Sequence, residues 1–561
     1  MGNMNMNMGN IPMMNNQQGF YPQTYQPYTM NQSNQGNVNS QNVPKQSNTI
    51  SNNKPNQQNQ NQNQKKKEEK PKEVKKEEKK PTPTTNNKQS SSNNVQKQKS
   101  DVAKIEKVEV KETKVEAEPE DVGEVISKEG KMVEVDETRD PAAIVFIGHV
   151  DHGKSTICGN ILLLTGQVDQ RTIEKYKSEA IKNKRESWYL AYLMDQNDEE
   201  KEKGKTVEIG KANFVLSKKR YTILDGPGHS GFLPNLLLGA CQADFACLVI
   251  SAKEGEFEAG FEKSGSTREH ALLAKSLGVN KVVMVINKMD EESVNWSEKR
   301  FNTIRNSLFD YLKKIGYKED DVFWVPVSGL HGDNIKEKLS KEKAPWYNGP
   351  SLFEVLDDLP VINRDYNGPV RFSILDRYKE GGMQIMGKVE SGTLKYGNTY
   401  TLMPNKQQVE VQWIFNSEEN GIPYAKAGES VRLKIKGVEN ESDIQRGNIL
   451  CSSDNLCGVF NTIIAEIVVL ELTEKKPIIS EGFSCVLHYH TIIVPCTIDK
   501  IMCEIDKKTK EEHKTKILKN YSKAKVVLQL DNIVSGEKFD LIPSLGRLTL
   551  RDEGRTIGVL S

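Results

Sequence analysis

The sequence predicts an α/β domain with a mostly parallel sheet and helices on both faces, followed by two β-barrel domains and preceded by a disordered extension. Three observations support this prediction. Residues 1–140 are polar or highly charged, short apolar runs alternate with helix-like stretches from 141 to 362, and closely spaced short strands fill the remainder. Alternating strands and helices are typical of a parallel sheet covered on both faces. Short strands separated by Gly, Asn and Pro are typical of barrels.

The extension has two compositions. Residues 1–64 consist mainly of Asn, Gln, Ser, Met and Tyr, and such a segment buries too little apolar surface to offset its chain entropy. We expect a Gln/Asn-rich, prion-like disordered segment there. Such a segment can self-assemble, and the alternative is a passive solvated tail. Residues 65–140 are expected to form a charged disordered linker, in which 65–80 carry nine Lys and five Glu whereas 115–140 carry ten acids and three bases.

The overall composition indicates in which cellular compartment the protein is expected. Lys and Arg total 78 against 77 for Asp and Glu, so no global charge favours nucleic acid. The eight Cys all lie at or beyond Cys158 and form no C-x-x-C pair, which favours a reducing environment. No apolar run is long enough to span a bilayer, and the N-terminus lacks a signal-peptide pattern. We therefore expect a cytoplasmic protein without a membrane partner.

The first expected strand, 144–147, runs directly into the sequence GHVDHGKST. Its Gly-x-x-x-x-Gly-Lys-Ser spacing is that of a phosphate-binding loop, in which backbone N–H groups of 151–155 point at a phosphate at the start of a helix. Lys154 is expected to reach the β- and γ-phosphates, and the Ser155 hydroxyl is expected to bind Mg²⁺. The other candidate residues of this loop are Gly148, His149, Val150, Asp151, His152, Gly153 and Thr156.

A second polar motif, DGPGH at 225–229, follows the next expected strand. Asp225 at a strand end is placed to hold the Mg²⁺ shell through water. Gly228 would leave a backbone N–H near the γ-phosphate, and His229 would lie where a water-orienting residue is required. Ordinary turn chemistry is the alternative for Gly-Pro-Gly.

Thr206, within EKGKTVEIG at 202–210, is our candidate for a second Mg²⁺ ligand. A Thr between the phosphate loop and the Asp225 motif is where a switch segment would sense the γ-phosphate. A Thr that simply begins a strand is the alternative.

The third motif, NKMD at 287–290, predicts which nucleotide binds. The Asp290 carboxylate can accept two hydrogen bonds from guanine, whereas adenine offers no matching donors, and two such bonds are worth about 3–6 kcal/mol. Asn287 and Lys288 would brace the loop and stack on the base. After the last expected strand, a backbone N–H could bond the guanine carbonyl from the SGL stretch, which consists of Ser328, Gly329 and Leu330. The sequence therefore predicts a P-loop GTPase domain that binds GTP and Mg²⁺.

The expected strands and helices give the domain limits. Apolar runs at 221–225, 245–251, 281–286 and 322–327 alternate with helix-like stretches that include 264–277 and 297–315. We expect a GTP-binding domain at 141–362, β-barrel domain 2 at 366–451 and β-barrel domain 3 at 455–561.

At this point the chain resembles a family. GHVDHGKST, DGPGH and NKMD, followed by two barrels, resemble the translational GTPases of the elongation-factor 1-alpha group. Within it, RESWYLAYLMDQNDEEKEKGKTVEIG, INKMDEESVNWSEKRF, LMPNKQQVEV and LTLRDEGRTI are similar to the eukaryotic peptide chain release factor GTP-binding subunits. The resemblance covers 141–561. Two residues depart from it. These subunits usually carry Ala or Ser at the position of His152, and Ala at the position of Gly226. The family also continues beyond 561, so the last barrel is expected to lack its final strand.

The resemblance implies a GTP hydrolase that acts in translation termination and is stimulated by the ribosome. Such a subunit would bind the stop-codon-recognising release factor through domain 3, and His229 would orient the attacking water. The FYP stretch at 20–22 partly matches the Phe-x-Pro core of ligands of poly(A)-binding protein, which is therefore a further candidate partner of the extension. The main alternative is a related translational GTPase for ribosome rescue or aminoacyl-tRNA delivery. Two further alternatives are a GTPase subunit for sulfate activation and a condensate scaffold whose GTPase activity is incidental.

Overall fold

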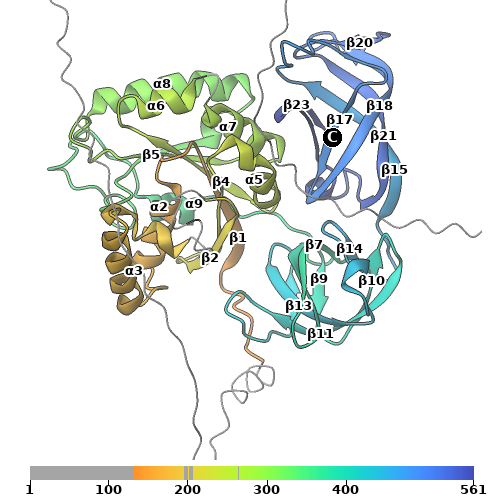
Figure 1. Cartoon of the computed structure of the whole chain (residues 1–561), viewed down its shortest axis with the longest axis horizontal. Helices are drawn as coiled ribbons and strands as arrows, with labels where there is room; N and C mark the ends of the chain where they lie inside the picture. Colours follow the sequence, from red (N-terminus) through yellow and green to blue (C-terminus); the bar gives the residue numbers. More distant parts are fainter. Residues whose placement is uncertain (1–131, 195–199, 201–205, 263–264) are drawn as a thin grey trace, which may run out of the picture. The chain divides into compact units, whose positions relative to one another are not determined.

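The structure is a computed structural model that describes residues 132–194, 200, 206–262 and 265–561 (Figure 1). The predictions for 1–64, and for the linker up to residue 131, lie outside the described residues, as do Gly204 and Lys205 of the switch motif. The described part contains an α/β domain followed by two β-barrels, so the predicted fold class is confirmed. None of the helices in these residues is both long and apolar enough to span a membrane.

The α/β domain is built on a six-stranded sheet in the order β2-β3-β1-β4-β5-β6. Strand β2 runs antiparallel to β3, and the other neighbours are parallel. Because parallel strands share a direction, the loops after β1, β3, β5 and β6 meet at one edge. The strands are β1 (Asp140–Ile147), β2 (Gly210–Val215), β3 (Lys219–Asp225), β4 (Phe245–Ser251), β5 (Val282–Asn287) and β6 (Val322–Pro326).

Strand β1 shows why the sheet is apolar on both sides. Ile144 and Phe146 pack with residues of α2 and α9, whereas Val145 and Ile147 pack with residues of α5, α7 and α8. Strands buried on both faces need continuous apolar sequence, as IVFI provides. The helices are α2 (Lys154–Leu164), α3 (Gln170–Lys182), α5 (Leu233–Ala240), α6 (Glu256–Phe261), α7 (Ser266–Ser276), α8 (Glu298–Lys314) and α9 (Leu352–Asp358), with short 3₁₀ turns at Glu186–Trp188, Ala191–Leu193, Ser230–Phe232 and Glu319–Asp321.

Helix α8 illustrates how local sequence sets the helix boundaries. The Ser297 side chain accepts a hydrogen bond from Arg300 N at 3.3 Å, and such a cap favours a helix start at that point. Phe301, Ile304 and Leu308 recur at helical spacing and are buried against the sheet. The sequence predictions of helices at 264–277 and 297–315 therefore agree with α7 and α8 to within two residues at each end.

The second domain is a closed barrel in the strand order β10-β11-β13-β8-β7-β14, with a small β12-β9 pair beside it. Inward-facing residues such as Leu433 and Ile435 alternate with polar outward-facing ones along β13. Its strands are β7 (Arg371–Lys379), β8 (Met383–Ser391), β9 (Thr393–Lys395), β10 (Thr399–Met403), β11 (Gln407–Phe415), β12 (Tyr424–Lys426), β13 (Ser430–Lys436) and β14 (Ile449–Ser452).

The third domain is a sheet in the order β17-β22-β23-β15-β21-β18-β19, and the additional pairing of β17 with β18 closes a ring. Strand β23 lies between β22 and β15 in this ring. The strands are β15 (Gly458–Val469), β16 (Ile479–Ser480), β17 (Ser484–Tyr489), β18 (Ile492–Ile505), β19 (Glu512–His513), β20 (Ile517–Leu518), β21 (Lys523–Gly536), β22 (Leu548–Asp552) and β23 (Arg555–Leu560).

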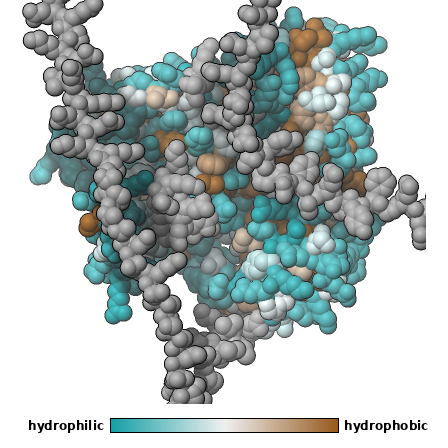
Figure 2. Space-filling view, viewed as in Figure 1, coloured by the Kyte–Doolittle hydropathy of each residue, from teal (hydrophilic) through white to brown (hydrophobic). Residues whose placement is uncertain are grey.

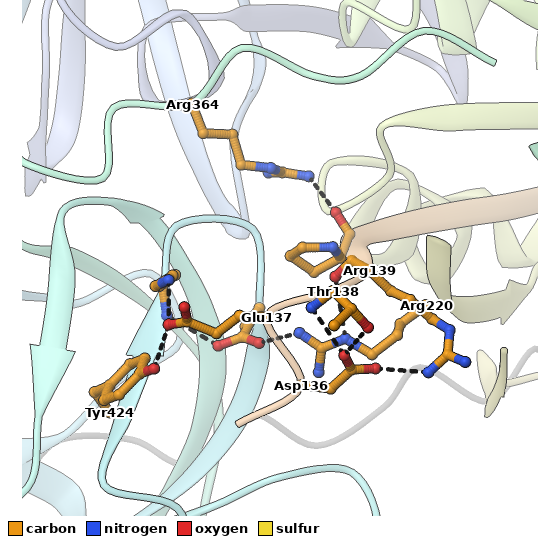
Figure 3. A network of polar contacts seen from close by, with 10 residues as sticks. Asp136, Glu137, Thr138, Arg139, Arg220, Arg364 and Tyr424 are labelled. Carbon is orange, nitrogen blue, oxygen red and sulfur yellow. Dashed lines mark hydrogen bonds and ion pairs between the residues drawn. The ribbon is translucent and has the colours of Figure 1, made fainter. Parts of the chain in front are cut away.

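The last residues of the charged linker are ordered, which differs from the prediction of disorder up to residue 140. The N–H of Val133 donates to Gly421 O at 2.8 Å, and the Glu137 carboxylate accepts hydrogen bonds from the Tyr424 hydroxyl and from Lys426 Nζ (Figure 3). Figure 3 shows these contacts beside the Arg139 and Arg220 side chains. Composition alone did not indicate this order, because the partners lie almost 300 positions away along the chain.

Candidate nucleotide-binding site

The phosphate loop connects β1 to α2, and its backbone depends on glycine. Gly153 has φ 88°, a left-handed conformation that glycine adopts without steric cost. A methyl group at this position would also overlap the Asn287 side-chain amide. Helix α2 begins at the next residue, Lys154, so the unpaired N–H groups of its first turn lie at the loop.

Lys154 is buried, and its Nζ donates a hydrogen bond to His149 O at 2.9 Å. Burial lowers the pKa of this amine, and the carboxylates of Asp225 and Asp151 oppose the lowering. The DGPGH loop lies directly against it, because a side chain at Gly228 would come within 2.6 Å of Lys154 Nζ. The structure thus brings the first two motifs together around one ammonium group.

The three predicted metal ligands also converge. Ser155 Oγ lies 3.2 Å from Thr206 Oγ1. Asp225 is fully buried, and neither of its carboxylate oxygens has a hydrogen-bond partner among the described residues. Burial raises the pKa of Asp225 to about 6, against the lowering effects of Ser155 and Lys154. A buried carboxylate without a partner is costly, and hard oxygen donors are what Mg²⁺ prefers, so this donor set fits Mg²⁺.

Two histidines, His149 and His270, connect the phosphate loop to helix α7. His149 Nδ1 lies 2.8 Å from Ser266 Oγ, which donates to Gly228 O at 2.9 Å and so connects the two loops through α7. His270 Nδ1 accepts a hydrogen bond from Gly148 N at 3.0 Å. Neither His149 nor His270 lines the cavity; His270 contacts the backbone of the phosphate loop, and His149 contacts α7.

Asn287 joins the phosphate loop to the loop after β6. Its Nδ2 donates to His152 O at 2.9 Å, and its Oδ1 accepts from Gly329 N at 2.7 Å. Asn160 of α2 adds a hydrogen bond to Gly329 O at 2.9 Å. The first residue of NKMD therefore joins two other loops.

Two further predicted residues of NKMD, Lys288 and Asp290, lie in the cavity wall. Lys288 has φ 60° and its Nζ donates to Glu256 Oε2 at 2.7 Å. Asp290 Oδ2 is 3.6 Å from His331 Nε2. Both side chains remain partly exposed, so the Asp290 carboxylate is accessible from the cavity.

These loops enclose a cavity of about 360 Å³, a size within the range of small-molecule sites. Most of the predicted residues line it, whereas Gly148, His149, His152, Asp225 and Ser328 do not. The predicted residues that line it are Val150, Asp151, Gly153, Lys154, Ser155, Thr156, Thr206, Gly228, His229, Asn287, Lys288, Asp290, Gly329 and Leu330.

His229 is exposed at this cavity. Its Nδ1 accepts a hydrogen bond from Gly231 N at 3.0 Å, and its ring lies 5.7 Å from that of Phe232. The Nε2 side of the ring is therefore the side left for a water molecule or a substrate.

Four cavity residues were missed from the sequence, namely Ser187, Trp188, Ala191 and Glu291. Three of them belong to the 3₁₀ segment after α3, where the Trp188 ring lies 4.6 Å from the Arg185 guanidinium carbon. That segment contains no nucleotide motif, and only the tertiary fold places it over the site.

Comparisons with known proteins agree with this geometry. Residues 140–361 match the elongation factor Tu GTP-binding domain, and residues 462–559 match the GTP-eEF1A C-terminal domain-like family. The eukaryotic peptide chain release factor GTP-binding subunit of Candida albicans is 46% identical over 423 residues, which are 75% of this chain and 59% of that protein. The subunit of Zygosaccharomyces rouxii is 43% identical over 467 residues, covering 81% and 70%.

Two solved structures are also similar. Sup35 complexed with GDP is 37% identical, with 75% of this chain and 93% of that chain covered and a TM-score of 0.34. The GTPase-like domain of S. cerevisiae Ski7, bound to GDP and inorganic phosphate, is 17% identical, with 78% and 99% covered and a TM-score of 0.62. The likeness to Ski7 concerns the fold alone.

The parallel sheet, the phosphate loop and the NKMD loop together define a GTPase domain of the elongation factor Tu type. More narrowly, the chain belongs to the family of eukaryotic peptide chain release factor GTP-binding subunits, because it covers 70% of a 43% identical member. The chain spans about three fifths of the length of the Candida albicans member.

The buried His270 predicts a pH dependence of stability. Burial lowers its pKa to about 3, so the folded ring stays neutral at pH values where an unfolded histidine, with an ordinary pKa of 6.5, takes up a proton. The unfolded state thus binds more protons below about pH 6.5, and the free energy of unfolding falls as the pH is lowered. His270→Asn keeps an acceptor for Gly148 N but cannot take up this proton.

We expect the wild type to lose roughly 2–3 kcal/mol more stability than His270→Asn between about pH 6.5 and pH 4. Urea unfolding followed by circular dichroism at each pH measures this difference. His331→Asn, at an exposed histidine, should behave as the wild type. Equal pH slopes for the wild type and His270→Asn would contradict the assignment.

Proposed function

We propose that this chain is the GTPase subunit of the translation termination complex. It binds the stop-codon-recognising release factor in the cytoplasm and couples GTP hydrolysis on the ribosome to release of the nascent peptide. The observation that carries the proposal is the 43% identity over most of a release factor GTP-binding subunit, in a chain whose predicted nucleotide residues converge on one cavity. The proposal keeps the domain limits expected from the sequence, with the GTPase domain at 141–362 and the barrels at 366–451 and 455–561.

In this proposal the phosphates of GTP lie on the phosphate loop. Backbone N–H groups of 151–155 at the start of α2 face the β-phosphate, and Lys154 contacts the β and γ oxygens. The buried ammonium of Lys154 supports this role, because its hydrogen bond in the structure is to a neutral backbone carbonyl, and a phosphate oxygen would offer it a charged acceptor. Ser155 and Thr206 would hold Mg²⁺ directly and Asp225 through water. When bound, the ion neutralises phosphate charge.

The base lies between the NKMD and SGL loops. Asp290 accepts hydrogen bonds from the guanine ring N–H and amine, and the Lys288 stem covers one face of the base. The backbone N–H of Leu330 is available to the guanine carbonyl, whereas the N–H of Gly329 already donates to Asn287. The accessible Asp290 carboxylate in the cavity wall supports this assignment.

For hydrolysis, His229 orients the attacking water. Its exposure at the cavity supports this role, since a neighbouring surface could move the ring toward the γ-phosphate. The sequence motifs supply no arginine finger within the chain, so intrinsic hydrolysis should be slow and docking on the ribosome should accelerate it.

The outer face of the last barrel supports a protein partner. On β15, Ile464 is 68% exposed and Val468 is 37% exposed, and Val527 pairs beside Ile464 on β21. Hydrophobic surface also gathers on the last barrel in Figure 2. Exposed apolar patches of this kind mark protein interfaces, and we assign this one to the release factor. The proposal further assigns the FYP stretch at 20–22, outside the described residues, to poly(A)-binding protein.

Asp290→Asn tests the guanine assignment. The amide can no longer accept two hydrogen bonds from guanine, but it can donate to the C2 carbonyl of xanthine. We expect GTP affinity to fall at least about a hundredfold and xanthosine triphosphate to bind better than GTP. Isothermal titration with GTP, XTP and ATP measures both effects, with Asp310→Asn on the exposed face of α8 as the control. Unchanged GTP affinity would remove Asp290 from the base site.

His229→Ala tests the water-orienting role. GTP affinity should stay within about twofold, while ribosome-stimulated hydrolysis should fall by about 10²–10⁴-fold, the range for loss of such a group. Single-turnover phosphate release with ribosomes measures this rate. His513→Ala, at an exposed histidine of β19, is the control and should keep the wild-type rate. Normal turnover of His229→Ala would end the assignment.

The proposed partner is tested by capture. The full chain with GTP, added to a translation extract, should retain the stop-codon-recognising release factor, identified by mass spectrometry. Ile464→Asp should reduce capture about tenfold or more, because a charge replaces an apolar contact. Ile181→Asp, at an apolar residue of α3 that is 59% exposed, should not reduce it. Stable capture of aminoacyl-tRNA or of a rescue decoding factor in its place would favour the alternative translational GTPases.

A further inference from the structure

The lysine of the NKMD loop is held by a glutamate from a different element. Lys288 Nζ donates to Glu256 Oε2 at 2.7 Å, and the two side chains are 29% and 31% exposed. Lys288 has a left-handed backbone, with φ 60°, so the local chain conformation is already restricted. Glu256 is the first residue of α6 and belongs to none of the nucleotide motifs.

A second hydrogen bond fixes the orientation of the Glu256 carboxylate. Ser251 Oγ, fully buried at the end of β4, donates to Glu256 Oε2 at 2.8 Å. Burial alone would raise the pKa of Glu256, but the hydrogen bonds from Lys288 and Ser251 outweigh it and the pKa is lowered. The carboxylate is therefore charged and has a defined direction at neutral pH.

The backbone that carries Glu256 is itself fixed by α8. Arg300 Nε donates to Ala252 O at 2.7 Å, and Arg300 Nη2 donates to Lys253 O at 3.1 Å. Arg300 Nη1 also pairs with Glu258 at 2.8 Å. Lys253 extends the network to Glu291 in the cavity wall, at 2.8 Å. A loop with this many charge-assisted contacts has little freedom to reorient.

Glu256 also contacts the phosphate loop. Its backbone O lies 3.3 Å from His152 Nε2, and His152 O accepts the hydrogen bond from Asn287 described above. The same residue therefore touches the loop that holds the phosphates and the loop that holds the base.

We propose that Glu256 is a positioning residue that sets how long guanine nucleotide stays bound, by holding the Lys288 side chain along the base. The inference rests on the proposed GTP site and adds the control of nucleotide release to it. Without Glu256, the Lys288 stem is free to leave the base, and the nucleotide dissociates faster. A change in the position of helix α6 would therefore alter the rate of nucleotide dissociation, although α6 itself does not contact the nucleotide.

The experiment uses the full chain loaded with fluorescent GDP and chased with excess unlabelled GDP. Glu256→Gln keeps the shape of the side chain and the bond from Ser251 but loses the ion pair, and we expect dissociation about three- to tenfold faster. Glu254→Gln, at an exposed residue of the same loop, is the matched control and should release GDP at the wild-type rate. Glu256→Asp keeps the charge and should fall between Glu256→Gln and the wild type.

A double-mutant cycle separates positioning from general stability. If Glu256 acts through Lys288, then Glu256→Gln should not accelerate release further in a Lys288→Met background. A wild-type release rate in Glu256→Gln, or the same acceleration with and without Lys288, would overturn the proposal. Its failure is distinguishable from failure of the GTP site, because Asp290→Asn tests the base site independently of Glu256.

Discussion

The central sheet is buried on both faces, and this constraint determines where the domain can place charge. Strand β1 is apolar from Ala142 onward, and β4 and β5 are apolar up to their last residue, so polar side chains are confined to the strand ends. Because these strands are parallel, the polar ends meet at one edge. The phosphate loop, the Asp225 loop and the NKMD loop are thus neighbours as a consequence of core packing, although more than 130 residues separate the first from the last.

That edge combines buried groups that protein contacts alone do not satisfy. The Lys154 ammonium is paired only with a backbone carbonyl among the described residues, and the oxygens of Asp225 have no partner there. The nearby His270 is kept neutral by burial. Such a site favours an anion together with a cation, because each would restore hydrogen bonds and charge balance that the fold has removed. Part of the free energy of binding such ions would therefore come from new hydrogen bonds to these buried polar groups.

The sequence predicted the fold class and most of the cavity wall, because these depend on short motifs and local periodicity. Lys154, Asp225 and Asp290 were found from spacing and strand ends alone. Trp188 and Glu256 were not, since their importance arises from tertiary contacts with residues in other motifs. Edge strand β2 was also missed, because its short sequence GKANFV has a weak apolar pattern. The order of residues 132–140 depends on a distant barrel strand and no local signal predicts it.

That ordered stretch has a mechanical consequence. The hydrogen bond to Gly421 and the contacts of Glu137 with Tyr424 and Lys426 attach the chain to the second domain just before β1 begins. A pull from whatever the preceding 131 residues bind is therefore borne first by a barrel, and not by the strand that carries the phosphate loop. The attachment therefore separates the phosphate loop from forces that act on the preceding part of the chain.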